Sequence, residues 1–386
     1  MKILFLIKAF AMKAGVERLM SDKINYMAGL GHQIMLVTYE QGAHPDVFPL
    51  HSSVRRADLD TRFFTLQKYS LLRRMWEIRR LRKIFGKRLQ KVVDDFKPDI
   101  IHSTTYSIGL IKQILNLRTN AKLTMESQVS YESELKETIF KGRGLLEPLA
   151  RWYDHRVLGK LHRFDAFFTL TKGDTEKWKQ HYDHITVIPN PLTHYPEEVK
   201  SHDKTLHRII CAGRLVFQKG FDLFVKAFAD IAGQCPDWHV DLFGSGEDEA
   251  MLRQMISERG LEQRIIMHPA TDHIYDEFQD SDFFVFPSRF EGWGLVIVEA
   301  MSCGIPVVSF RCDYGPEDIV TDGHDSLLVT NGDTKEMGEK ILWMIHHPEE
   351  RVRMGAEARI TAKKYRKEII SQQWIDVFSA LLAEKG

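Results

Sequence analysis

The chain has 386 residues, which is too long for one ordinary compact domain and suits two domains. Its residues are 44% hydrophobic and 27% charged, a composition that is typical of globular proteins and excludes a disordered or fibrous chain. The 53 basic residues equal the 53 acidic residues in number, so no overall positive field favours a nucleic-acid partner.

The first predicted element is a buried strand at residues 3–7. The N-terminus reads MKILFLIKAF, and a basic start followed by an apolar run is also typical of a secretion signal. Lys8 ends the run after residues 3–7, which is short for the apolar part of a signal, so a strand is favoured. No stretch approaches the roughly 18 apolar residues that a membrane-spanning helix needs.

Short apolar runs then alternate with helix-length stretches along the chain. This pattern, repeated in both halves, predicts two doubly wound parallel sheets, whose ligands bind outside the carboxyl ends of the strands. The predicted strands are residues 3–7, 33–39, 99–103, 122–125, 166–170 and 185–189 in the first half, and residues 207–213, 239–244, 264–268, 283–287, 306–310 and 326–329 in the second.

A polar, proline-interrupted stretch without periodicity, residues 190–204, is the predicted linker between the halves. We therefore expect two domains, one at residues 1–190 and the other at residues 205–365. The chain after about residue 333 is rich in helix-forming residues. We expect residues 366–386 to form a helix that packs back on the first domain.

The basic charge of the first half is concentrated in one segment. From Leu71 to Val92, apolar residues recur at spacings of three and four, which predicts an amphipathic helix over residues 68–93. The bases are either a solvated face or a surface that binds anionic lipid headgroups, and we favour the second interpretation. It predicts peripheral association with the cytoplasmic face of a membrane. Against one acid, Glu77, residues 62–91 contain the bases Arg62, Lys68, Arg73, Arg74, Arg79, Arg80, Arg82, Lys83, Lys87, Arg88 and Lys91.

The segment AGRLVFQKGF follows the first strand of the second half. It places Arg214 at the strand end and Lys219 where the next helix begins. Two cations beside a helix N-terminus are suited to bind a diphosphate, because unpaired amides add to their charge. An ordinary surface arginine and a helix-start lysine are the alternative interpretation.

Two predicted turns contain glycines that can be interpreted in two ways. Gly244 and Gly246 follow a strand, but Glu249 stands where a third glycine would complete a dinucleotide fingerprint. They permit either close approach to a ligand or a tight turn, and we favour the turn. Gly15, where the first helix begins, has the same two interpretations.

The segment PSRFEGWGLVIVEAMSCG contains two glutamates that are candidate ligand-binding residues. Glu291 precedes a predicted helix and Glu299 lies one turn inside it. Ionised carboxylates suit the vicinal hydroxyl groups of sugars, because they accept two hydrogen bonds at once. Glu299 is otherwise a helix-interior acid in an apolar run, and an unpaired charge is costly to bury.

These segments resemble the retaining glycosyltransferases of family four, which have the GT-B fold. The similarity is dense at GRLVFQKG, GSGE, EGWGLVIVE, AMSCGIPVV and YGPEDIVTDGHDSLLV within residues 207–330, and looser at AGVERLM, GHQIMLVT, PDIIHS and VIPNP. It implies an α/β architecture of two Rossmann-like domains that face each other across a cleft. The domain at residues 205–365 would hold most of a nucleotide sugar, and the domain at residues 1–190 would bind the acceptor.

The resemblance also implies roles for single residues. Arg214 and Lys219 would bind the diphosphate of a UDP-sugar, and Glu291 would contact the transferred sugar, so these three form the expected catalytic set. Glu299 would bind the ribose. The other expected donor contacts are Gly15, Gly244, Gly292, Trp293, Gly294 and Leu295.

His102 and Glu126 are further candidates, as contacts of the sugar or the acceptor. A core or strand-end histidine is the alternative for His102. Two Asp-x-Asp pairs, at residues 58–60 and 280–282, are interpreted as loop and helix-end carboxylates, and the four cysteines lack a disulfide or metal spacing. We therefore expect no metal, no other cofactor and a reducing cytoplasm.

The sequence thus predicts a retaining, metal-independent hexosyltransferase. YGPEDIV resembles a loop of bacterial lipopolysaccharide, capsule and lipid-linked glycan transferases, several of which use UDP-galactose or its N-acetyl relatives. The expected acceptor is a glycan or lipid-linked glycan in surface polysaccharide synthesis. The basic helix at residues 68–93 would then bind either the membrane or the phosphates of that acceptor. One alternative is a catalytically silent nucleotide-sugar-binding subunit. A second alternative, an NAD-dependent oxidoreductase, requires the glycine fingerprint that neither half contains.

Overall fold

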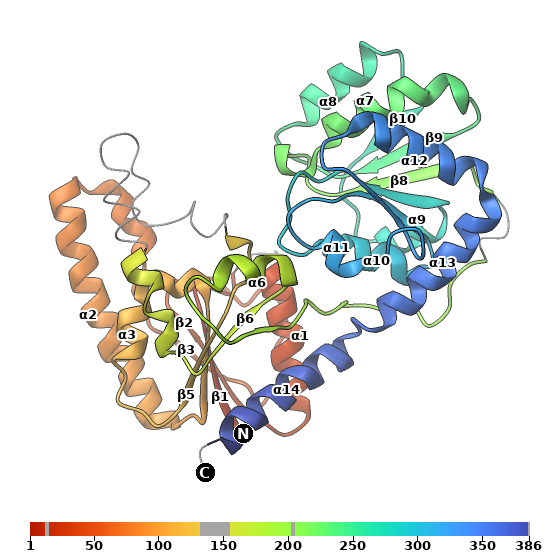
Figure 1. Ribbon diagram of the computed structural model, residues 1–386. Helices are drawn as coiled ribbons and strands as arrows, with labels where there is room; N and C mark the ends of the chain where they lie inside the picture. Colours follow the sequence, from red (N-terminus) through yellow and green to blue (C-terminus); the bar gives the residue numbers. More distant parts are fainter. Residues whose placement is uncertain (12–14, 132–154, 202–204, 385–386) are drawn as a thin grey trace. The chain divides into compact units, whose positions relative to one another are not determined.

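The computed structural model describes the chain except for residues 12–14, 132–154, 202–204 and 385–386, and forms two compact units (Figure 1). Unit 1 comprises Met1–Pro189 and Lys367–Gly386, and unit 2 comprises Asn190–Arg366. Each unit has a parallel sheet with its own hydrophobic core, which confirms the predicted pair of Rossmann-like folds.

The sheet of unit 1 has the strand order β3-β2-β1-β4-β5-β6-β7. Its central strand β1 is almost completely buried, which confirms the strand predicted at residues 3–7. Such apolar strands are typical of parallel sheets that are covered on both faces. The strands are β1 (Lys2–Ile7), β2 (Gln33–Thr38), β3 (Arg55–Asp58), β4 (Ile100–Thr104), β5 (Lys122–Glu126), β6 (Ala166–Thr169) and β7 (Ile185–Val187).

Strand β3 was not among the predicted strands. Its sequence, RRAD, contains no apolar run, because it pairs only with β2 at the edge of the sheet and is mostly exposed. Charged side chains on an edge strand also discourage pairing with other chains.

Helices cover both faces of this sheet. The segments α2 (Leu71–Phe96) and α3 (Ile111–Leu115) share one hydrophobic core, which includes Leu4 and Leu6 of β1. The helix α1 (Gly15–Gly29) packs beside the last helix of the chain, α14 (Lys367–Ala383), on the other face (Figure 1). The shorter helix α6 (Lys172–Trp178) lies between β6 and β7 along the chain.

The long helix α2 confirms the helix predicted for the basic segment. Its second half packs on the sheet through residues spaced three or four apart: Leu81, Phe85, Leu89, Val93 and Phe96 are buried. Lys97 ends the helix in the left-handed conformation, with φ of 52°, and the following proline disfavours further helix. The first half has no comparable run of buried residues.

Unit 2 has the strand order β10-β9-β8-β11-β12-β13. Its main core lies between this sheet and the helices α7 (Phe221–Ile231), α8 (Glu249–Ser257) and α12 (Thr334–His346). The strands are β8 (Arg208–Ala212), β9 (His239–Phe243), β10 (Ile265–His268), β11 (Phe283–Phe286), β12 (Val307–Phe310) and β13 (Leu327–Val329). The remaining helices are α9 (Ile274–Gln279), α10 (Leu295–Ser302), α11 (Pro316–Ile319) and α13 (Pro348–Lys363).

Two sequence-based expectations concern composition. Across the ranges that the structure describes, no helix has the length and apolar character required to cross a membrane. Cys211, Cys235, Cys303 and Cys312 are all buried and free.

Candidate nucleotide-sugar site

The candidate site lies where the strand order of unit 2 reverses. Chain order runs outward from β8 to β10 on one side and from β11 to β13 on the other. Loops that leave the carboxyl ends of β8 and β11 therefore start side by side, and such switch points are the usual ligand sites of parallel sheets. These two loops carry Arg214, Lys219, Glu291 and the glycines around Trp293.

Backbone contacts hold the two loops together. The amide of Arg289 donates to the carbonyl of Gln218 at 2.8 Å, and Gln218 Nε2 donates to the carbonyl of Phe290 at 3.0 Å. Gly220 has a φ of 65°, and a Cβ there would lie 2.0 Å from the carbonyl oxygen of Pro287. Only glycine permits this approach, so the sequence QKG fixes the spacing of the loops.

Arg289 adds a second connection that the sequence analysis missed. Its guanidinium binds both carboxylate oxygens of Asp222 on α7, each at 2.7 Å. Burial alone would raise the pKa of Asp222, but the hydrogen bonds and charge of Arg289 lower it. The planar fork matches a carboxylate, which makes this pair a rigid support for the loop that carries Glu291.

Lys219 and Glu291 form an ion pair within this site. Lys219 Nζ lies 2.7 Å from Glu291 Oε1, and the exposed fractions of the two side chains are 14% and 8%. The ammonium also lies 5.2 Å from the ring centroid of Phe286 at the end of β11. The structure thus pairs Lys219, which is predicted to bind the diphosphate, with Glu291, which is predicted to bind the sugar. The charge of each side chain neutralises that of the other.

Arg214 lies on the same loop but in a different environment. Its side chain is exposed, and Arg214 Nη2 lies 3.5 Å from Gln218 Oε1. A guanidinium held this loosely can turn toward an anion at little cost. Lys219 is therefore fixed by its partner, whereas Arg214 is adjustable.

The N-terminus of α10 follows directly. Gly294 caps it with a φ of 93°, a left-handed conformation that favours glycine. The helix begins at Leu295, so its first amides point away from the helix where an anion can bind. Glu299 lies one turn further along and is half-buried. Gly292 is half-buried in the preceding loop.

Trp293 lies in the loop between β11 and α10. The residue is 5% exposed, and its ring lies 5.3 Å from the ring of Tyr365. A Cβ on Gly315 would lie 1.8 Å from the carbonyl oxygen of Trp293, so the neighbouring loop can pass only as glycine. The side chain of Trp293 is buried, and its indole Nε1 has no hydrogen-bond partner within the described part of the chain.

The glycines after β9 have a local explanation. A Cβ on Gly244 would lie 2.0 Å from the carbonyl oxygen of Gly213, and one on Gly246 would lie 2.2 Å from that of Leu215. The turn interpretation accounts for both residues through the close approach of two loops. Gly15 differs, because a Cβ there meets nothing within 4 Å.

Both carboxylates of the second Asp-x-Asp pair form ion pairs with basic side chains. Asp280, at the end of α9, pairs with Lys200, and Asp282 pairs with the buried Arg351 at 2.9 Å. Asp282 Oδ2 also accepts from the amide of Arg208 at 3.0 Å. These carboxylates therefore hold the linker, α9 and α13 to the sheet. In the first pair, Asp60 binds Arg62 and Asp58 accepts from Thr38.

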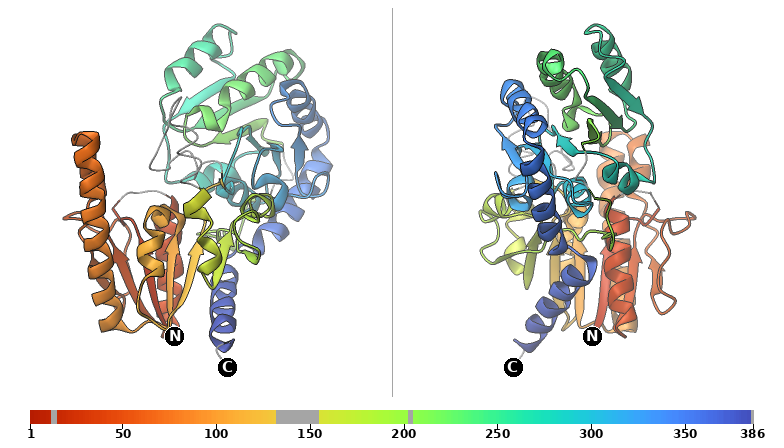
Figure 2. Two further views of the ribbon diagram at one scale, coloured as in Figure 1. Left: turned by 60° about the vertical axis from the view of Figure 1, so that its left-hand side comes forward. Right: turned by 90° about the vertical axis from the view of Figure 1, so that its right-hand side faces the viewer.

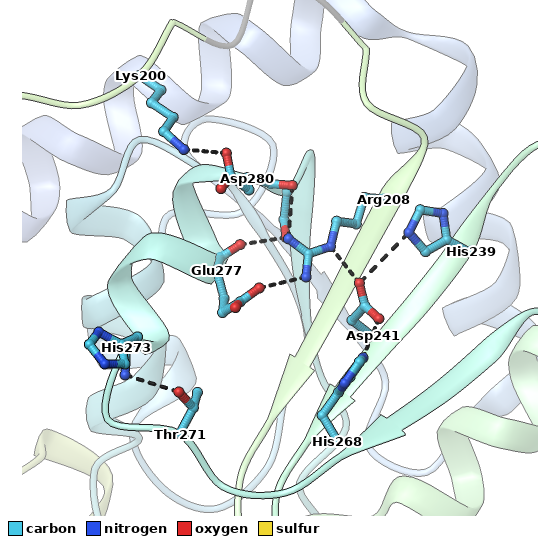
Figure 3. Close-up of polar contacts among 10 residues, drawn as sticks. Lys200, Arg208, His239, Asp241, His268, Thr271, His273, Glu277 and Asp280 are labelled. Carbon is cyan, nitrogen blue, oxygen red and sulfur yellow. Dashed lines mark hydrogen bonds and ion pairs between the residues drawn. The ribbon is translucent and has the colours of Figure 1, made fainter.

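A polar network on β8, β9 and β10 extends this connection (Figure 3). Asp241 accepts from Arg208 Nε at 2.5 Å and lies 2.6 Å from His268 Nε2, while Arg208 Nη2 binds Glu277 of α9 at 2.6 Å. Burial would raise the pKa of Asp241, but hydrogen bonds from Arg208 and His268 lower it. The network holds α9 against the sheet, and its residues lie outside the two loops that form the candidate site.

In unit 1, His102 and Glu126 lie beneath α14. Both are almost fully buried, and His102 Nε2 is 3.4 Å from Glu126 Oε1. The His102 ring lies 5.0 Å from the ring of Trp374 and 5.5 Å from that of Phe378. This burial favours the interpretation of His102 as a core histidine, and the roles of both residues as acceptor contacts stay predictions.

Lys23 of α1 completes this cluster and was missed from the sequence. Its Nζ lies 2.6 Å from Glu126 Oε2 and 3.8 Å from the centroid of the Trp374 ring. Burial lowers the pKa of Lys23, and the charge of Glu126 opposes that change. For Glu126, burial would raise the pKa, but Lys23 and then His102 lower it to about 2. A lysine among the apolar positions of α1 was the available signal.

Replacing Lys23 with methionine is expected to destabilise unit 1 by about 3–5 kcal/mol, because Glu126 would keep a buried charge without its nearest cation. Urea unfolding followed by circular dichroism measures this loss. Lys8→Met is the matched control, since Lys8 pairs with Glu40 at 3.7 Å and its side chain is 57% exposed. The control is expected to cost about 0–1 kcal/mol. Equal losses for the two variants would contradict a stabilising cluster.

Two family models match adjoining parts of the chain. "Glycosyltransferase Family 4" matches residues 14–194, and "Glycosyl transferases group 1" matches residues 196–361. The chain belongs to the GT-B glycosyltransferases. The predicted family and fold are thereby confirmed.

Relatives of this glycosyltransferase are found by sequence and by structure. An uncharacterized glycosyltransferase of Haemophilus influenzae is 25% identical over 379 residues, which cover 97% of this chain and 98% of the relative. The lipopolysaccharide outer core galactosyltransferase WaaB has a TM-score of 0.77 at 18% identity, over 98% of this chain and 100% of that one. Anabaena HepE, solved in complex with UDP, has a TM-score of 0.72 at 18% identity, over 98% and 100%.

Proposed function

We propose that this glycosyltransferase moves a hexose, galactose or an N-acetylhexosamine, from a UDP-sugar to a glycan or lipid-linked glycan of a bacterial surface polysaccharide, with retention of configuration and without a metal. The observation that carries the proposal is the Lys219–Glu291 ion pair at the switch point of unit 2. Further support comes from two structural neighbours, of which one is a galactosyltransferase and the other binds UDP.

Donor binding would rearrange this ion pair. In the free protein Glu291 neutralises Lys219. A diphosphate carries more negative charge than one carboxylate, so it is expected to take over the ammonium of Lys219 and to recruit the exposed Arg214. Glu291 would then be free to accept hydrogen bonds from hydroxyl groups of the sugar. One movement therefore couples capture of the phosphates to orientation of the sugar.

The chemical step places negative charge on the departing phosphate. The bond between the anomeric carbon and the β-phosphate oxygen breaks as the bond from the acceptor oxygen to that carbon forms. The acceptor proton passes to the phosphate oxygen that leaves, and attack occurs on the same face of the sugar. Lys219, Arg214 and the amides at Leu295 would stabilise the developing charge, which is the largest catalytic contribution expected here. No protein nucleophile is assigned.

The remaining donor contacts follow from position. Glu299, one turn inside α10, would accept the ribose hydroxyl groups of UDP. The backbone at Gly292, Gly294 and Leu295 would contact the sugar and the phosphates. Gly15 and Gly244 are proposed near the donor, with support from the sequence resemblance alone.

The alternatives predict different products. A silent nucleotide-sugar-binding subunit would bind the donor without turnover. The presence of Arg214, Lys219, Glu291 and Glu299 together argues against it. An NAD-dependent oxidoreductase requires a glycine fingerprint that is interrupted at Glu249, the first residue of α8.

A donor screen tests the proposed function. Purified protein is heated with each of a panel of UDP- and GDP-sugars, and the expected result is a raised melting temperature with a UDP-hexose. The same donor is then incubated with a lipid-linked glycan in excess chelator, and mass spectrometry is expected to detect the extended acceptor. Binding without product supports the silent subunit. Product that requires added Mg²⁺ or Mn²⁺ contradicts the metal-independent mechanism.

A further inference from the structure

The outward face of α2 combines apolar side chains in its first half with basic side chains along its length. Leu72 is 81% exposed and Trp76 is 60% exposed, although both belong to residue types that are usually buried. Phe64, in the short helix before α2, is 55% exposed. Leu72 and Trp76 lie in the half of α2 that precedes its first core contact at Leu81. Figure 2 shows this end of α2 extending beyond the carboxyl ends of the strands of unit 1.

Four bases share this face. A helix turns about 100° per residue, so Leu72, Trp76, Lys83 and Lys87 fall within an arc of about 60° on the side opposite Phe85 and Leu89. Arg73 and Arg79 border the arc. Arg73, Arg79, Lys83 and Lys87 are exposed, and among the described residues none of them forms an ion pair.

The mixture of side chains distinguishes between two anionic partners. A soluble polyanion needs only the bases, and an exposed tryptophan and leucine would add nothing to its binding. A bilayer with anionic headgroups uses both, because tryptophan and leucine enter the interfacial region while lysine and arginine remain near the phosphates. A solvated face explains the bases but leaves these two apolar side chains in water.

We propose that the outward face of α2 docks on an anionic lipid bilayer, with Leu72 and Trp76 entering the interface and with Arg73, Arg79, Lys83 and Lys87 facing the headgroups. The sequence predicts only the electrostatic part of this contact, since its apolar stripe turns toward the core. The proposed contact concerns unit 1 alone and does not depend on the donor sugar.

Vesicle flotation tests the contact. The wild type is expected to float with vesicles of phosphatidylcholine and phosphatidylglycerol at low salt, and to bind pure phosphatidylcholine at least tenfold more weakly. High salt is expected to weaken binding, because the Debye length falls to about 3 Å at 1 M salt. Two variants separate the contributions: Leu72→Gln with Trp76→Gln, and Arg73, Arg79, Lys83 and Lys87 all changed to glutamine. Each is expected to reduce binding at least tenfold.

Control variants use residues of unit 2 that are also exposed. Met251→Gln with Ile360→Gln removes two exposed apolar groups, and changing Arg253, Arg259, Lys335 and Lys363 to glutamine removes four exposed bases. Both controls are expected to float like the wild type. Transfer to a soluble acceptor is expected to be unchanged in all four variants, so loss of flotation is distinguishable from loss of the proposed activity.

Fluorescence locates the inserted residue. The chain has seven tryptophans, and brominated acyl chains quench only those that enter the bilayer. Trp76→Phe is expected to abolish most of this quenching and to retain flotation. The proposal is overturned if the wild type does not float at low salt, or if the Leu72 and Trp76 variant floats normally while soluble polyphosphate displaces it. That last outcome identifies a polyanion site.

Discussion

Replacing Lys219 with methionine is expected to reduce turnover by about 10²–10³-fold, which is the usual cost of removing one donor that stabilises developing charge. The expected cause is weaker stabilisation of the departing diphosphate. Initial rates at saturating donor measure the effect. Lys226→Met is the matched control, because Lys226 is an exposed lysine on the neighbouring helix α7 and its loss is expected to leave turnover unchanged.

Lys219→Met also leaves Glu291 buried without its cation, so a second variant is needed to separate an effect on catalysis from an effect on folding. Arg214→Gln removes an exposed side chain whose only hydrogen bond among the described residues is the 3.5 Å contact with Gln218. It is expected to preserve the melting temperature and to reduce turnover at least tenfold. Normal turnover in Arg214→Gln, together with a lowered melting temperature in Lys219→Met, would assign Lys219 a structural role.

Glu299→Gln and Glu291→Gln are expected to affect UDP differently. If Glu299 binds the ribose, its loss should weaken UDP binding about 10- to 100-fold, the equivalent of one hydrogen bond to a charged group. Glu291→Gln should preserve or raise the affinity for UDP, because its expected partner is the sugar and its loss frees Lys219 for the diphosphate. It should also reduce turnover. Isothermal calorimetry with free UDP gives both affinities, and initial rates give the turnover.

Glu339→Gln, at an exposed position of α12, is the control for both glutamates. It is expected to leave affinity and rate unchanged. Unaltered UDP affinity in Glu299→Gln would reject the ribose assignment. Weakened UDP binding in Glu291→Gln would instead assign Glu291 a contact with UDP itself.

Most strands of the fold can be predicted from sequence because parallel strands are buried on both faces and therefore read as apolar runs. The pattern fails at β3, where an edge strand with the sequence RRAD pairs on one side only. It also fails to predict the exposure of α2. Spacing identifies an apolar stripe from Leu71 to Val92, but only the structure shows that the core begins at Leu81 and that Leu72 and Trp76 face outward.

The candidate site could be predicted in its parts but not in its pairing. Motif and strand position identify Lys219 and Glu291 separately. Their ion pair depends on two loops that are 72 residues apart in sequence, and on Gly220, which permits those loops to touch. Lys23 was missed for the same reason, since its partners Glu126 and Trp374 come from distant segments that meet only in the folded unit.

The return of α14 to unit 1 has a consequence for biosynthesis. Residues 1–189 leave the ribosome first, yet the helix that covers Lys23 and Glu126 is encoded after all of unit 2. At about 5–20 residues per second, synthesis of residues 190–366 delays the appearance of α14 by about 10–35 s. During that interval, His102, Phe168 and Lys23 of the nascent unit 1 lack the contacts that Trp374 of α14 provides. Completion of the N-terminal fold is therefore a late event, and a premature stop codon near the end of the gene would damage the opposite end of the protein.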